Sequence, residues 1–179
     1  MYAHSTTTLG ILSAMALAVP AQRAPSFTLD AAGAVNLNAA GREARYGAIA
    51  PDPLGPPLLS ISIGPAAAGS VLQLTVPGGW VPATGRYPIR STWSDPAIAP
   101  AFHASFSAGS PEHPLGWFHG EYGTVTITRA AGGRLAGRFE IRARGFLSAD
   151  PANEDRWVTV TGSFEADGDT TATAVATAR

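Results

Sequence analysis

The 179-residue sequence contains no cysteine and no lysine, and only 14% of its residues are charged. Without cysteine the chain has no disulfide, no thiolate metal site, no cysteine nucleophile and no cysteine for lipid attachment. The formal net charge of −1 does not by itself indicate a polyanionic partner such as nucleic acid. The chain must therefore be held together by packing and by backbone hydrogen bonds.

The longest apolar run lies at the N-terminus, at residues 9–19. It has the length of a signal-peptide core and is too short to span a bilayer. Val19 and Ala21 supply the small residues needed for cleavage before Gln22. Residues 1–8 contain no Lys or Arg, and the alternative is an apolar helix packed on the domain. The sequence predicts a signal peptide over residues 1–21 and a periplasmic or extracellular mature protein.

The clearest pattern in the chain is an alternation of apolar and polar side chains with a period of two. A side chain on one face at every second residue is typical of a half-buried strand. No sustained helical period follows residue 21, and Gly, Pro, Asn and Asp separate the strand candidates. The candidates are residues 26–30, 34–38, 43–49, 59–63, 72–76, 87–91, 102–107, 123–129, 134–144 and 158–166.

The predicted fold class is all-β, an antiparallel β-sandwich of about ten strands, with a calycin-like barrel as the alternative. The sandwich domain covers residues 22–166, and the Thr- and Ala-rich tail, 167–179, is predicted to be disordered. Pro88 places its strand at a sheet edge or a bulge. Long irregular connections are expected at residues 95–101, 109–117 and 147–155.

The alternation also indicates which side chains of the strands point into the core. Gly137 and Gly162 fall at such inward positions, which predicts a bulge, a close approach or an aromatic ring covering each gap. The expected core residues are Val125, Ile127, Leu135, Phe139, Ile141, Val158, Val160 and Phe164, with Ile61, Ile63, Leu72, Leu74 and Val76 opposite them.

The strand sequences at residues 123–128, 133–143 and 158–166 resemble a bacterial pattern. They are similar to the C-terminal half of uncharacterised exported or lipoprotein-like all-β domains. The resemblance covers about a quarter of the chain, residues 121–166. It implies an all-β fold and an exported protein and assigns no catalytic residue. Many such domains carry a lipid-modified cysteine, and its absence here implies a soluble rather than an anchored state.

Residues 112–122 form the densest cluster of polar and aromatic side chains. His113, His119 and Glu121 are of the types that bind Zn²⁺, and His103 is a fourth candidate. Their spacing matches no metal motif, and the alternative is that these side chains are solvated. We therefore assign no metal site from the sequence.

Two further sets of side chains are candidates for binding. Six aromatic residues would form a platform that stacks on sugar rings, or would cap the ends of the core instead; they are Trp80, Trp93, Trp117, Trp157, Tyr87 and Tyr122. An outward row would bind an acidic surface polymer, or would be a solubilising ladder; it comprises Arg134, Arg138, Glu140, Arg142 and Arg144, with Thr124, Thr126 and Glu165 nearby.

The sequence contains little that indicates catalysis. There is no Gly-x-Ser-x-Gly motif, and Ser110, Glu112 and His113 are close only in sequence. Carboxylate pairs drawn from Asp95, Glu112 or Glu121 would be unremarkable in any β protein. We expect a non-enzymatic binding or envelope-associated structural protein without a cofactor, with carbohydrate or another envelope component as partner. The alternative is a small secreted metal-binding or hydrolytic domain that uses residues 112–122.

Overall fold

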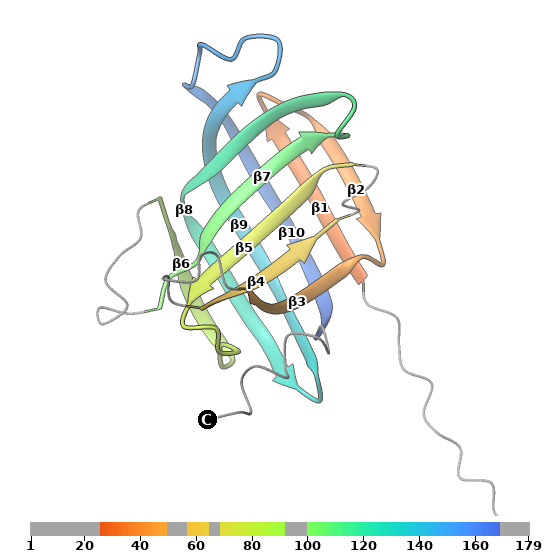
Figure 1. Ribbon diagram of the computed structural model, residues 1–179, viewed down its shortest axis with the longest axis vertical. Helices are drawn as coiled ribbons and strands as arrows, with labels where there is room; N and C mark the ends of the chain where they lie inside the picture. The colour runs from red at the N-terminus through yellow and green to blue at the C-terminus, as the bar shows by residue number, and fades with distance from the viewer. Residues whose placement is uncertain (1–25, 50–56, 65–68, 92–99, 169–179) are drawn as a thin grey trace, which may run out of the picture.

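The computed structural model describes residues 26–49, 57–64, 69–91 and 100–168 (Figure 1). These residues form ten strands and no helix, which confirms the predicted all-β fold. The strands are β1 (Ser26–Gly33), β2 (Leu37–Gly41), β3 (Ala44–Ile49), β4 (Leu58–Ile63), β5 (Val71–Pro77), β6 (Gly85–Arg90), β7 (His103–Gly109), β8 (Pro114–Ala131), β9 (Arg134–Leu147) and β10 (Arg156–Gly168).

Some predictions concern residues outside this part of the chain. The predicted signal peptide lies there entirely, as does the predicted tail after Gly168, while Asp167 and Gly168 belong to β10. The predicted strand at 34–38 is displaced: the strand begins at Leu37, and the side chain of Asn36 accepts a hydrogen bond from the Gly33 amide in the turn before it. No helix with the length and apolar character to cross a membrane occurs among the described residues.

All ten strands belong to one sheet. Its order is β2-β1-β10-β3-β4-β5-β7-β8-β6, and β9 pairs with both β8 and β10. The pairings therefore form a circuit from β10 through β9, β8, β7, β5, β4 and β3, closed by a short parallel contact in which Asp167 and Gly168 of β10 pair with Arg45 and Tyr46 of β3. In Figure 1 the sheet curls so that β3, β4, β5 and β7 lie in front of β9 and β10, and β8 bends from the front to the back.

The curled sheet encloses one hydrophobic core. All the inward residues predicted from the alternation are buried, from both the β8–β10 side and the β4–β5 side. Pro88 lies in β6, which ends the strand order beside β8, as predicted for a proline that cannot donate to a ladder.

Two phenylalanines cover the two inward glycines of β9 and β10. Gly162 pairs with Phe139, and Gly137 pairs with Phe164. A Cβ added to Gly162 would lie 2.7 Å from Cζ of Phe139, and one added to Gly137 would lie 2.9 Å from Cζ of Phe164. The predicted aromatic cover is confirmed, and each ring occupies the space that the opposing glycine leaves.

The strand β8 is much longer than the prediction. It runs over 18 residues and contains two register shifts, between Gly120 and Tyr122 and between Ile127 and Arg129. Each bulge adds one residue, so the inward residues change phase along the strand. The predicted irregular stretch at 109–117 is wrong for residues 114–117, because β7 ends at Gly109 and β8 begins at Pro114, with only a tight turn between them. The predicted connection at 147–155 is confirmed between β9 and β10.

Candidate functional site

The outward side chains of β8, β9 and β10 form a polar surface, called here the outer face. Directly paired residues of antiparallel strands point to the same side of the sheet, so the register places them in rows. From β8 through β9 to β10 the rows are Thr126–Arg138–Ser163, Thr124–Glu140–Thr161 and Tyr122–Arg142–Thr159.

Tyr122, Arg142 and Trp157 meet on this face and are called here the aromatic cluster. The ring centroids of Tyr122 and Trp157 are 6.2 Å apart, and Cζ of Arg142 lies 5.3 Å from the Trp157 ring centroid. Arg142 also donates from Nη1 to Oγ1 of Thr159 at 2.9 Å, and Trp157 donates from Nε1 to Oδ1 of Asp155 at 3.0 Å. These contacts fix the orientation of the half-buried Trp157, while Tyr122 remains 59% exposed.

The first bulge of β8 brings Tyr122 to this face. His119 points outward, and strict alternation would turn Tyr122 toward the core. The register shift after Gly120 instead pairs Tyr122 with the outward Arg142. Glu121, the extra residue, forms an ion pair with Arg144 over 3.7 Å. The aromatic cluster therefore depends on an irregularity that period-two reasoning does not detect.

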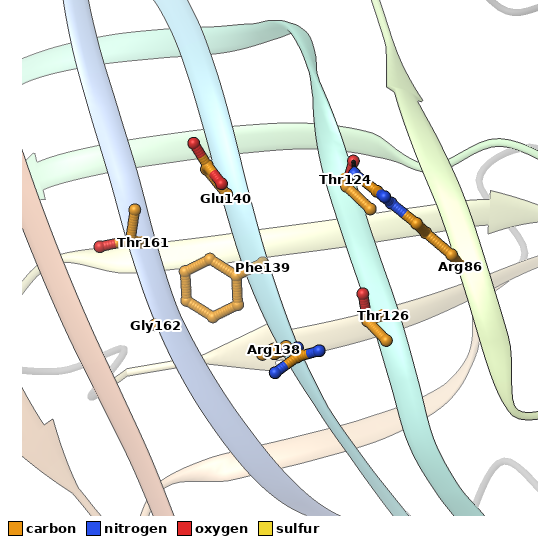
Figure 2. A pocket seen from close by; sticks show the side chains of 8 residues that line it. All are labelled: Arg86, Thr124, Thr126, Arg138, Phe139, Glu140, Thr161 and Gly162. Atoms are coloured by element: carbon orange, nitrogen blue, oxygen red, sulfur yellow. Dashed lines mark hydrogen bonds between the residues drawn. The ribbon is translucent and has the colours of Figure 1, made fainter.

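A hollow of about 580 Å³ lies on the outer face beside the aromatic cluster (Figure 2). Three charged side chains line it: Arg86 from β6, and Arg138 and Glu140 from β9. Arg86 donates from Nη2 to Oγ1 of Thr124 at 3.4 Å. Among the described residues, the side chains of Arg138 and Glu140 have no hydrogen-bond or ion-pair partner. The remaining lining residues are Thr124, Thr126, Phe139, Thr161 and Gly162.

The sequence interpretation missed Arg86. It lies on β6 opposite Thr126, and Arg86, Pro88 and Arg90 alternate with the partly buried Tyr87 and the buried Ile89. That alternation was a usable signal of an outward basic pair. The local sequence does not, however, indicate that β6 pairs with β8, and this pairing is what places Arg86 on the outer face.

The other predicted aromatic residues that the structure describes do not join the cluster. Trp117 is 52% exposed on β8 but lines a separate hollow of about 340 Å³ beside the β7–β8 turn. Trp80 lies against Gly78 in the β5–β6 connection. Tyr87 packs edge-on against Phe102, with ring centroids 5.6 Å apart. Trp93 lies outside the described residues. Of the five predicted aromatic residues that are described, Tyr122 and Trp157 are the two that meet on the outer face.

The predicted row of arginines divides into two parts. Arg134 lies 3.0 Å from Oε1 of Glu165 and 3.3 Å from Oδ1 of Asp167, and Arg129 lies 3.6 Å from Oε1 of Glu165. This end of β9 is the solubilising, ion-paired ladder of the alternative interpretation. Arg138 has no such partner in the described part of the chain, and Arg142 packs on Trp157.

The candidate metal ligands do not converge. His113 lies in the β7–β8 turn, where its backbone amide donates to Oγ of Ser110 at 3.1 Å, so the serine hydroxyl caps a turn. His119 is exposed on β8, and Glu121 is paired with Arg144. Within the four described ranges, no three or more His, Cys, Asp or Glu residues are grouped so that they could hold a metal ion. Asp95 lies outside those ranges.

His103 predicts a pH dependence of stability. Burial lowers the pKa of His103 below its ordinary value of 6.5, against a smaller opposing effect of a hydrogen bond with the Arg90 backbone. As the pH falls, His103 is therefore protonated at a higher pH in the unfolded chain than in the folded protein. The free energy of unfolding decreases as the pH falls below 6.5. We expect His103→Gln to flatten the change in urea midpoint between about pH 7.5 and about pH 5.5. An equal change in both proteins would contradict this.

Comparisons of the chain with protein-family models, with curated proteins and with solved structures gave no match. The resemblance to bacterial exported domains remains a prediction.

Proposed function

We propose that the chain is an exported bacterial, non-enzymatic binding protein that holds a carbohydrate on the outer face. The observation that carries this proposal is the aromatic cluster, in which Tyr122 and Trp157 meet from two different strands at the solvent-facing surface. The apolar run at residues 9–19, followed by small residues before Gln22, supports export. The protein would then act in the periplasm or outside the cell.

The chemistry of this face suits a sugar chain. A flat aromatic ring complements the apolar C–H face of a sugar ring, and the contacts of Trp157 hold its ring in place before a ligand arrives. Threonine hydroxyls, which both donate and accept, line the adjoining hollow and match the hydroxyl groups of a sugar.

A binding role fits the hollow better than a hydrolytic one. Glycoside hydrolysis uses two carboxyl groups that flank the scissile bond. Among the residues that line the hollow, Glu140 is the only carboxylate.

Removing the Tyr122 ring should weaken binding without unfolding the protein. We expect Tyr122→Ala to raise the dissociation constant for a bound polysaccharide about tenfold, because one exposed stacking surface is lost. Affinity electrophoresis with dextran, xylan, carboxymethyl-dextran and polygalacturonate measures this.

Trp80→Ala is the matched control, since Trp80 is 45% exposed, lies between β5 and β6, and belongs neither to the aromatic cluster nor to the lining of the hollow. Its affinity should equal that of the wild type. The proposal fails if no polysaccharide in the panel retards the protein, or if Tyr122→Ala and the wild type bind equally.

A further inference from the structure

We infer that the hollow selects an acidic polysaccharide, with Arg86 and Arg138 binding its anionic groups. This inference rests on the proposed function and adds the class of ligand.

The part of the outer face around the hollow is basic although the chain as a whole is not. Across the three rows, extended to β6 on one side and to β1 on the other, four arginines face two carboxylates. The local net charge is thus about +2, against −1 for the whole chain. The residues are Arg86, Arg90, Arg138 and Arg142, with Asp30 and Glu140.

The arginines of the hollow are available to a ligand. Arg138 is exposed and has no ion-pair partner among the described residues, whereas Arg134, four residues earlier on the same strand, has two. Arg86 has one long hydrogen bond, to Thr124. In Figure 2 the Arg86 and Arg138 side chains come from opposite sides of β8. A guanidinium group presents a planar fork that matches a carboxylate or a sulfate.

Glu140 limits which polyanion is accepted. Its row lies between the row of Arg138 and the row of Arg142. There its carboxylate accepts hydrogen bonds from sugar hydroxyls. A polymer with closely spaced charges would bring an anion against it. Arg138 and Arg142 are four residues apart on one strand, about 14 Å. A ligand that contacts both the aromatic cluster and Arg138 is therefore longer than one sugar ring.

The test uses three polymers with one backbone: dextran, carboxymethyl-dextran and dextran sulfate. The wild type should bind at least one acidic form about tenfold more tightly than dextran. The double variant Arg86→Gln/Arg138→Gln should lose about tenfold in affinity for the acidic form and nothing for dextran. Carboxymethyl-dextran and dextran sulfate then distinguish a carboxylate from a sulfate as the anionic group.

Arg42→Gln is the control for position: it removes one of the two charges lost in the double variant, from an exposed residue just after β2, three strands from β9 in the sheet. It should bind like the wild type, and thermal unfolding should show all variants folded. Equal binding of dextran and its acidic forms, or an unaffected double variant, overturns the inference and leaves the proposed function standing. Competition by oligo(dT) as strong as by the acidic dextran overturns it in favour of general polyanion binding. No binding to any of the three polymers overturns the inference, and the proposed function falls with it if xylan and polygalacturonate also fail to retard the protein.

Discussion

Replacing Phe139 by alanine is expected to lower the free energy of unfolding by about 3–5 kcal/mol. The ring is only 4% exposed and fills the space above Gly162, which has no side chain of its own. The cavity left behind would be bordered by two paired backbones that cannot move together without breaking the β9–β10 ladder. The loss therefore combines the transfer of the ring with an unrelaxed cavity.

Urea unfolding measures this loss, and the neighbouring residue supplies the control. Arg138 points outward and is exposed, so Arg138→Ala should change the free energy of unfolding by no more than about 0.5 kcal/mol. A loss below about 1 kcal/mol for Phe139→Ala would show that the gap above Gly162 closes, contrary to the packing described here.

Replacing Gly123 by alanine is expected to cost about 2–4 kcal/mol. Its φ of +147° is rare for residues with a side chain. An added Cβ would also meet the carbonyl oxygen of Glu140 and would lie 2.9 Å from Cα of Ile141. Both atoms belong to the backbone of β9, so no side-chain rotation relieves the clash.

Gly132 separates the two causes of this loss. It also has a positive φ, +63°, but no atom lies within 4 Å of the position of an added Cβ. Gly132→Ala should therefore cost only about 1–2 kcal/mol, from the left-handed conformation alone. Chemical denaturation of both variants measures the difference, and equal losses would mean that the contact with β9 contributes nothing.

Much of the fold could be predicted because period-two alternation depends on local sequence. It located β4, β5, β9 and β10 within a few residues and named Val125, Phe139 and Phe164 as core. It also identified the glycines that large rings cover. The alternation failed along β8, where two bulges shift the phase and divide one strand into apparently unrelated segments.

The candidate site was harder to predict because it depends on which strands adjoin. Tyr122 and Trp157 were both singled out, but their meeting requires a bulge in β8 and the registers that place β9 between β8 and β10. Arg86 reaches the hollow only because β6 pairs with β8. Residue types indicated the chemistry, whereas long-range pairing brought together Tyr122 and Trp157 out of the five predicted aromatic residues that are described. It also separated Arg138 from the ion-paired Arg134.

The unequal flanks of β3 have a consequence for how the molecule moves. One flank pairs with β4 along the whole strand, while the other, within the described residues, meets β10 only at Arg45 and Tyr46. Local opening is easiest where the fewest hydrogen bonds must break. Transient opening of the sheet should therefore start between β3 and β10. The amides of this contact should exchange with solvent before those of β9, which is paired on both sides.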